Sequence, residues 1–523
     1  MEVRVQGKQE APLQGIDPVL AEIHKRLQSH PQEWLHSLQK NPAGFADLEK
    51  KVHHAFQQMA DQLVAGLLAQ ATKGDDFADN AKKKVTANRE RRFRAARPQS
   101  LKLRLLGGLV LLVSTLYCAA STIRKSGRRR GCEGGGIYPE LGWLGFLEGK
   151  SPALVRDVAR QAALLPSYAV ARAELLERGL QLNIKEVHNI SVHAGQAAIT
   201  LRRRELELFR QGKLPAADGQ GKRLGAMIDG GRVKLRKTTR RQKGRGKTKT
   251  QKRRFKTVWR EVKQIIVFEM DEQGRMKKGT QPLFDGTFLG PNEAMEMLAL
   301  RLHQLGASQA EVVAFRCDGA PWIWDRLAWV QKRLGLSDKQ VSLGLDWCHA
   351  VHHVSLALEL VLQGAERKRV FKKMRKWLRA GRWRKVVDEL VRLATAAKLP
   401  EKSAVWTEIA YVGRHGEDGH MDYALYRRRG LPMGSGAIES AIRRVINLRL
   451  KGNSVFWEEE NAEGMLQIRG LALSGRWDAT FANITTSLAG DRRLEWHWQS
   501  PDMTAELKAP AAILIPTPQP LTV

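Results

Sequence analysis

The sequence predicts an α/β core with a mixed five-stranded sheet, helical N-terminal domains and a large all-helical insertion. Three patterns support this fold class. Apolar residues recur every three or four positions in residues 45–71, as in an amphipathic helix. Short apolar strands alternate with helices from residue 224 onward, and residues 350–430 have the pattern of nearly continuous helix. We therefore expect about three or four domains in the 523 residues.

The net charge of +34 limits the function classes more than any other property of the composition. Lys and Arg number 88, against 54 Asp and Glu. A positive field of this size attracts polyanions, and neutralising phosphates with release of counterions is the usual source of affinity for nucleic acids. We expect a nucleic-acid partner, and an anionic membrane surface is the competing hypothesis.

The N-terminal sequence argues against secretion, because residues 1–15 lack a basic segment followed by an apolar one. Residues 105–120 are apolar, but they are too short to span a bilayer comfortably, and a Gly-Gly pair interrupts them. We predict a β-hairpin here, with strands at 101–106 and 109–118. An interfacial or membrane segment is the alternative, and we expect no membrane partner.

The four cysteines, Cys118, Cys132, Cys317 and Cys348, are too scattered for a disulfide framework, which suits a reducing cytosol. Cys118 and Cys132 flank a basic, Gly-rich segment and could form half of a zinc ribbon. Because no second pair of ligands stands nearby, we expect no structural zinc.

Residues 1–100 form the first predicted region and 101–215 the second. The helical stripe of the first region is hydrophobic core or the seam of a dimer, and it consists of Phe45, Leu48, Val52, Phe56, Met59, Leu63, Leu67 and Leu68. In the second region, helices at 152–164, 168–178 and 184–192 follow the hairpin. Residues 167–192 could be a helix-turn-helix that reads DNA, and ordinary helical packing is the alternative.

Residues 216–358 form the first part of the predicted core. Its elements in order are strands at 224–228, 262–270 and 282–288, a helix at 292–305, a strand at 311–316, a helix at 324–334 and a strand at 340–345. Three strands, helix, strand, helix, strand is the order of the RNase H-like mixed sheet. The helical insertion at 359–430 follows, then the last core segment at 431–480 with a helix at 437–450. The Pro-rich tail, 481–523, is expected to be partly disordered.

Two acids, Asp229 and Asp318, follow apolar strands and precede Gly. Acids at strand ends of an open α/β sheet project into the crevice at the carboxyl edge, and these two strands are neighbours in the predicted fold. Two converging carboxylates repel unless a cation intervenes. Mg²⁺ binds one or two carboxylates together with water and phosphate, and two such ions can catalyse phosphoryl transfer. Each Asp-Gly alone is also a common turn.

A third acid must come from a helix beside those strands, and Glu439 supplies it. In the helix at 437–450 we expect Ile438, Ala441, Ile442, Val445 and Leu448 to be buried. Glu439 and Arg443 lie four residues apart on another face. A helix-start Glu with an Arg partner is the alternative explanation.

The block at residues 430–470 is the most specific motif of the chain. It contains Gly-Leu-Pro-Met-Gly-Ser-Gly-Ala-Ile-Glu-Ser, Arg-Leu-Lys-Gly at 449–452, Trp457 and Ala-Glu-Gly-Met-Leu-Gln-Ile-Arg at 462–469. With Asp-Gly-Gly-Arg at 229–232, Asp-Gly-Ala-Pro-Trp at 318–322 and Leu-Asp-Trp-Cys-His at 345–349, it resembles bacterial insertion-sequence transposases of the Kra type. These are DDE enzymes related to the Mutator-like group, and the resemblance covers roughly residues 100–475.

The resemblance implies a catalytic triad of Asp229, Asp318 and Glu439 that binds Mg²⁺ or Mn²⁺, two ions in all, with a large helical insertion before the Glu. It also implies that Asp346 and His349, the acid and base of an Asp-x-x-His pair, orient DNA or support the metal ligands, and we group Arg443 with them. A zinc site at Cys348, His349 and His352 is a minor alternative. The family often keeps more cysteines near Cys118 and Cys132 than this chain does.

Residues 232–260 carry fifteen Lys or Arg and no acid. We predict a long loop beside the active site that meets DNA phosphates without reading bases, and a solvated loop is the alternative. We expect Trp322, Trp324 and Trp329 to pack in the core, whereas Trp457 could instead stack on an unpaired or flipped base. The candidate DNA-binding residues are Arg232, Arg240, Arg241, Lys243, Arg245, Lys252, Arg253, Arg254, Arg449, Lys451 and Trp457.

The expected activity is metal-dependent cleavage and strand transfer at the ends of an insertion sequence. The partners would be double-stranded DNA, as terminal inverted repeats and target, and further copies of the chain in a homodimer or higher oligomer. The expected location is the bacterial cytoplasm, on the nucleoid. Two alternatives stay open: an RNase H-like or resolvase-type nuclease, and a catalytically silent DNA-binding descendant of a transposase.

Overall fold

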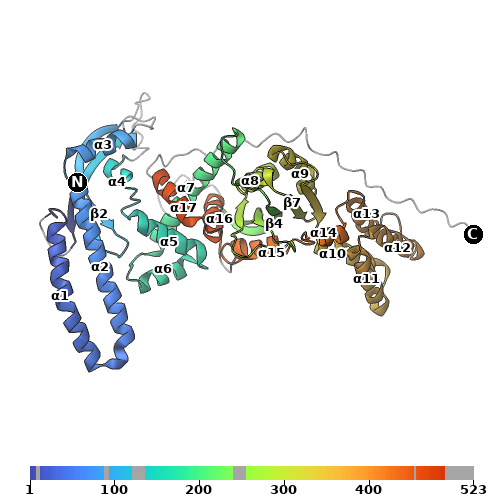
Figure 1. The fold of residues 1–523 in the computed structure, drawn as a ribbon, viewed down its shortest axis with the longest axis horizontal. Coiled ribbons are helices and arrows are strands. Elements are labelled where there is room, and N and C mark those ends of the chain that lie inside the picture. Colours follow the sequence, from blue (N-terminus) through green and yellow to red (C-terminus); the bar gives the residue numbers. More distant parts are fainter. Residues whose placement is uncertain (7–11, 87–92, 121–135, 239–254, 453–454, 489–523) are drawn as a thin grey trace, which may run out of the picture. The chain divides into compact units, whose positions relative to one another are not determined.

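The computed structural model describes residues 1–6, 12–86, 93–120, 136–238, 255–452 and 455–488 (Figure 1). The chain forms two compact units. The first contains Met1–Leu201 and the segment that begins at Arg476, and the second contains Arg202–Gly475. Several predictions fell on Cys132, residues 240–254 and residues 489–523 of the tail, which lie outside the described residues.

The first unit begins with two long antiparallel helices beside a three-stranded sheet (Figure 1). Helices α1 (Asp17–Lys40) and α2 (Phe45–Ala71) pack on each other. Strands β2 (Phe93–Arg104) and β3 (Val110–Ala120) form an antiparallel hairpin, and β1 (Glu2–Val5) pairs with β3. The predicted hairpin is therefore confirmed, with longer strands. No helix within the described ranges is long and apolar enough to cross a membrane.

The apolar stripe of α2 is only partly core. Met59 is 5% exposed, whereas Phe45, Phe56 and Leu67 are 54%, 50% and 49% exposed. These three residues are eleven positions apart, so they lie on one line along the helix. These three residues do not belong to the core, because α1 covers the neighbouring face of α2, and for them the dimer-seam alternative stays open. Their side chains form an exposed apolar line along α2 that a further partner could contact.

The rest of the first unit is helical, as predicted. Its helices are α3 (Asp75–Thr86), α4 (Pro139–Trp143), α5 (Pro152–Leu164), α6 (Tyr168–Glu177), α7 (Ile184–Arg210), which continues into the second unit, and α17 (Trp477–Leu488). Ser151 and Ser167 cap α5 and α6 by accepting hydrogen bonds from Leu154 N and Val170 N. A DNA-reading role for these helices stays a prediction.

The second unit contains the predicted mixed five-stranded sheet, with strand order β6-β5-β4-β7-β8. The strands are β4 (Arg223–Thr238), β5 (Phe255–Glu269), β6 (Leu283–Thr287), β7 (Val312–Cys317) and β8 (Val341–Leu345). The first three pair antiparallel, and β4, β7 and β8 run parallel. The parallel connections pass through helices α8 (Pro291–Gln304) and α9 (Pro321–Leu334).

Two boundaries in this sheet differ from the prediction. Strand β4 does not end at residue 228 but runs on to Thr238, and β5 begins at Phe255, which pairs with Thr238. Most of the described part of the predicted basic loop is therefore a two-stranded ribbon. The physical reason is a period of two: Val233 and Leu235 are buried, while Arg232 before them and Arg236 after them are exposed. The many Lys and Arg residues of this segment favoured the prediction of a loop over that of two alternating strands.

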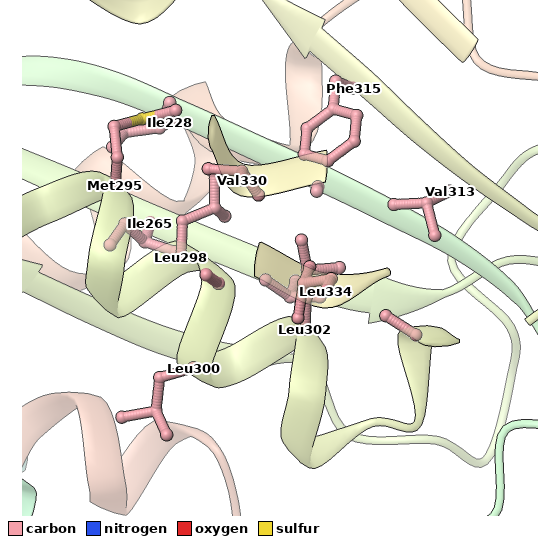
Figure 2. Packing of buried hydrophobic residues seen from close by; sticks show 14 of the residues in the cluster. Ile228, Ile265, Met295, Leu298, Leu300, Leu302, Val313, Phe315, Val330 and Leu334 are labelled. Atoms are coloured by element: carbon pink, nitrogen blue, oxygen red, sulfur yellow. The ribbon is translucent and has the colours of Figure 1, made fainter. Parts of the chain in front are cut away.

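One face of the sheet packs against α8 and α9 to form the main core of the second unit (Figure 2). Figure 2 shows Ile228 and Ile265 from the sheet against Met295 and Leu298 of α8, with Val330 of α9 nearby. The predicted core tryptophans, Trp322, Trp324 and Trp329, pack partly buried against this core.

A buried ionic network ties α7, α8 and β6 to α16 (Glu459–Leu473). Asp285 of β6 accepts hydrogen bonds from Arg202 Nη1 at 3.1 Å and Arg301 Nε at 2.8 Å. Arg202 also contacts Glu463 at 2.5 Å and Gln467 at 2.9 Å. All three charged residues at its centre are at most 2% exposed. The charged form of Asp285 is favoured because Arg301 and Arg202 outweigh the effect of burial and hold its pKa below the usual range.

The predicted helical insertion is present. Its helices are α10 (Trp347–Val361), α11 (Gly364–Arg379), α12 (Trp383–Ala396), α13 (Ala404–Glu417) and α14 (Tyr423–Arg428). The first of them, α10, starts directly after β8 and packs on α13.

The last core helix differs in detail from the prediction. It consists of α15 (Gly436–Ala441) continued by a π-helix, η3 (Ile442–Asn447). A π-turn holds more residues than an α-turn, so the residues after Ile442 are rotated relative to the expected 3.6-residue stripe. Leu448, expected to be buried, is 55% exposed, and Ile446 is buried in its place.

Candidate active site

Three acids form one row across the parallel strands of the second unit. The paired register of β4 and β7 ends at Ala226 and Phe315. Asp229 and Asp318 each follow three residues later, and the Asp318 charge acts on Asp229. The register of β7 and β8 pairs Cys317 with Leu345. One more step places Asp318 beside Asp346, whose N donates a 2.8 Å hydrogen bond to Cys317 O.

Asp229 faces the helix that carries Glu439. Gly231 shares a face of β4 with Asp229, because alternate strand residues point the same way. A Cβ at Gly231 would lie 2.8 Å from Ile446 Cδ1, so η3 packs directly on this face. Helix α15 itself packs against β4 and β5. Asp229 lies inside its strand rather than at the strand end that the sequence suggested.

Burial and neighbouring charges raise the pKa values of the first two acids. Burial and the Asp318 carboxylate raise the pKa of Asp229 to about 6, although Gly230 N donates a hydrogen bond to it at 2.5 Å. Burial also raises the pKa of Asp318, against the hydrogen bond from Ala320 N at 3.1 Å. A pair of half-buried carboxylates that resist ionisation together is the environment that a cation relieves.

Asp346 has a structural role, because hydrogen bonds to neighbouring elements engage both of its carboxylate oxygens. It is 1% exposed and caps α10 by accepting hydrogen bonds from His349 N and Nδ1, both at 2.9 Å. Its other oxygen accepts a hydrogen bond from Ser435 N, just before α15. These donors hold the pKa of Asp346 below its usual range despite burial, and the hydrogen bond to Asp346 raises the pKa of His349. Asp346 thus joins the end of β8 to the start of the helix with Glu439.

Glu439 and Arg443 are exposed on α15 and η3. The charge of Glu439 contributes to the raised pKa of Asp229, so it acts on the same site. Within the described ranges, however, no three His, Cys, Asp or Glu side chains are grouped closely enough to hold a metal ion together. The structure brings Asp229 and Asp318 side by side and leaves Glu439 outside their immediate contact.

Two residues at this site escaped the sequence analysis. Trp324 Nε1 donates a 2.6 Å hydrogen bond to Asp318 O. Tyr411, from α13 of the insertion, lies against Gly319 so closely that no Cβ would fit there. Its ring stacks on His353 at 3.6 Å between centroids. No sequence pattern marks Tyr411 as a site residue, because it lies in an ordinary amphipathic helix, α13, far along the chain.

The predicted DNA contacts divide into three groups. Arg232 and Lys451 are exposed, as a phosphate contact requires. Arg449 and Trp457 are 3% and 5% exposed, so the prediction that they contact DNA is wrong. Trp457 Nε1 donates to Leu450 O at 3.1 Å, and the Arg449 guanidinium lies 5.0 Å from the centre of its ring. The third group lies outside the described residues: Arg240, Arg241, Lys243, Arg245, Lys252, Arg253 and Arg254.

Comparison with known proteins does not assign the chain to a family. No protein-family model matches the sequence, and no curated protein matches it. The likeness to insertion-sequence transposases therefore depends on the motifs of the sequence itself.

Proposed function

We propose that the chain is a DNA transposase with an RNase H-like core, in which Asp229, Asp318 and Glu439 are the catalytic acids. The main support for this proposal is that β4 and β7 are parallel neighbours in a sheet with strand order β6-β5-β4-β7-β8, and that the charge of Asp318, just after β7, acts on Asp229 of β4. Two such carboxylates, with raised pKa values, suit phosphoryl transfer to or from a polyanionic substrate.

The donor set at this edge of the sheet fits Mg²⁺ or Mn²⁺. Asp229 and Asp318 offer hard oxygen ligands, and their mutual repulsion favours a divalent cation between them. Mg²⁺ needs only one or two carboxylates when phosphate and water complete its shell. Asp346 is committed to His349 and Ser435, so Glu439 is the acid left for the third role. The bound metal would activate the attacking oxygen and stabilise the leaving one.

The residues at this site would have different roles in the proposed reaction. Asp229 and Asp318 would hold the divalent cation, which would in turn bind the reacting phosphate. Helix α15 would bring Glu439 toward them when DNA binds, and Asp346 keeps that helix anchored through Ser435. His349, held by Asp346 and close to both acids, is placed to donate a proton to a phosphate or leaving oxygen.

The DNA partner is supported by the charge of +34 and by the basic ribbon next to Asp229. Such an enzyme would act on nucleoid DNA in the bacterial cytoplasm and would bind two element ends at once, which requires more than one copy. The exposed line of Phe45, Phe56 and Leu67 on α2 is the surface that we propose for self-association. Residues 17–71 carry five Lys or Arg against six Asp or Glu, so two copies would not repel there.

A nuclease of the RNase H or resolvase type is the second candidate, because it would use the same acids. The test is incubation of the purified chain with the DNA that flanks its own gene and with Mg²⁺. Cleavage at the element ends followed by joining of the 3′ hydroxyl to target DNA supports a transposase. Cleavage without joining supports the nuclease. DNA binding without cleavage in Mg²⁺ or Mn²⁺ supports the silent descendant.

A further inference from the structure

The β4–β5 ribbon presents one face to solvent beyond the core of the sheet. Opposite residues of an antiparallel pair share a face, and Lys234 pairs with Trp259 while Arg236 pairs with Thr257. This face carries Arg232, Lys234 and Arg236 on β4 and Phe255 and Trp259 on β5. We call these five residues the ribbon face.

The aromatic rings of the ribbon face are exposed and lie beside cations. Trp259 is 57% exposed, the highest fraction among the large apolar side chains that the structure describes, and Phe255 is 41% exposed. Lys234 Nζ lies 5.1 Å from the centre of the Trp259 ring, and the Arg236 guanidinium lies 4.0 Å from that of Phe255. Most tryptophan rings in folded proteins contribute to stability by being buried, and a ring as exposed as that of Trp259 contributes little in this way.

The other face of the ribbon is fixed to the second unit. Val233 and Leu235 are buried, and Arg236 N donates a 2.6 Å hydrogen bond to Trp457 O. The Arg260 guanidinium contacts Glu459 at 3.2 Å. The ribbon face is thus held in a defined position by buried contacts behind it, as a binding platform requires.

The ribbon face lies near the candidate active site but points away from it. Lys234 is five residues after Asp229 on the same strand, which is about 17 Å at 3.3–3.4 Å per residue. Because 229 is odd and 234 even, their side chains lie on opposite faces. A strand bound on the ribbon face is therefore a different strand, or a different part of one, from the strand held by Asp229 and Asp318.

We propose that the ribbon face binds an unpaired DNA strand, with bases stacked on Trp259 and Phe255 and phosphates paired to Arg232 and Arg236. Alternating aromatic and cationic side chains are the pattern by which proteins bind single strands without reading sequence. A duplex keeps its bases stacked inside. Its phosphates would contact the cationic side chains, but its bases would not stack on Trp259 and Phe255. Glu261 shares this face but is neutralised by Lys263 at 3.3 Å. The inference relies on the proposed function only in taking DNA as the ligand.

The experiment is fluorescence anisotropy of the full chain with a labelled single-stranded oligonucleotide and with its duplex, without divalent metal. Trp259→Ala should weaken single-strand binding about 5- to 150-fold and change duplex binding less than about twofold. Trp259→Phe should restore most of the single-strand affinity, because it restores a stacking ring. Trp143→Ala is the matched control, since Trp143 is 38% exposed beneath the Lys84 ammonium, and it should change neither affinity.

Three results would overturn the inference. They are an unchanged single-strand affinity of Trp259→Ala, an equal loss on single strand and duplex, or no rescue by Trp259→Phe in a variant whose thermal unfolding is normal. Each is distinct from failure of the proposed function. Metal-dependent cleavage is read in a separate assay, and a chain without cleavage can still bind a single strand through Trp259.

Discussion

Replacing Asp229 by Asn should stabilise the metal-free protein at neutral pH. The pKa of Asp229 is raised from 3.8 to about 6, mainly by burial and then by Asp318. A folded-state pKa above the unfolded one means that the folded chain binds more protons between pH 4 and 6, so stability falls as pH rises through that window. Two pKa units correspond to about 3 kcal/mol. Because the Asp229 side chain is only partly buried, solvent screens part of this effect, and we expect about 1–2 kcal/mol.

Denaturant unfolding at pH 7 and pH 4, with and without Mg²⁺, measures this effect. Asn keeps an oxygen that can accept the hydrogen bond from Gly230 N, so only the charge is removed. The variant should gain about 1–2 kcal/mol at pH 7 without metal and little at pH 4, and it should lose the stabilisation that Mg²⁺ gives the parent chain. Asp325→Asn on α9 is the matched control. A variant less stable than the parent at pH 7 without metal would refute the electrostatic account of this site.

Three further changes test other parts of the molecule. Asp285→Asn should destabilise the second unit by about 3–5 kcal/mol, because it leaves Arg202 and Arg301 buried without their shared counter-ion, and calorimetry measures this. Deleting 240–254, which carries nine Lys or Arg, should weaken duplex binding equally for element ends and unrelated DNA and should flatten the salt dependence. Phe56→Glu should shift sedimentation of the full chain toward the monomer, because it places a charge in an apolar seam.

Each of these changes has an outcome that contradicts it. Asp285→Asn unfolding within about 1 kcal/mol of the parent would show that the network contributes little. A loss of affinity confined to the element ends would show that 240–254 reads sequence. Leu176→Glu, at a 43% exposed position on α6, is the control for Phe56→Glu, and equal effects of the two would remove α2 from the seam.

The sheet was predictable because its strands are buried and end at recognisable turns. Predominantly apolar runs at 224–228 and 311–316 located two of the strands. The order of strands and helices along the chain matched the RNase H-like sheet, in which these two strands are neighbours, and β4 and β7 do pair. The ribbon was not predictable in the same way. Its Lys and Arg gave the composition of a loop, while the decisive signal was only Val233 and Leu235 at a spacing of two.

Contacts made over long sequence distances were beyond the sequence analysis. Trp457 had polar neighbours in the sequence, yet it is buried against Leu235 through a backbone bridge that no local pattern encodes. Trp259, in the middle of a basic segment, is the exposed ring instead. The π-helix η3 also has no reliable sequence signature, and its extra residues per turn explain why Leu448 and Ile446 exchange their expected places.

The most direct test of the central claim is metal-dependent strand cleavage by Asp229→Asn, Asp318→Asn and Glu439→Gln, with Asp346→Asn beside them. Each of the first three substitutions should lower cleavage by about 10²-fold or more, while DNA affinity stays within a few-fold of the parent. Asp346→Asn should weaken cleavage less and should alter its pH profile, since it acts through His349. Cleavage at near the parent rate by Glu439→Gln, together with its loss in Asp346→Asn, would contradict the claim and make Asp346 the third acid.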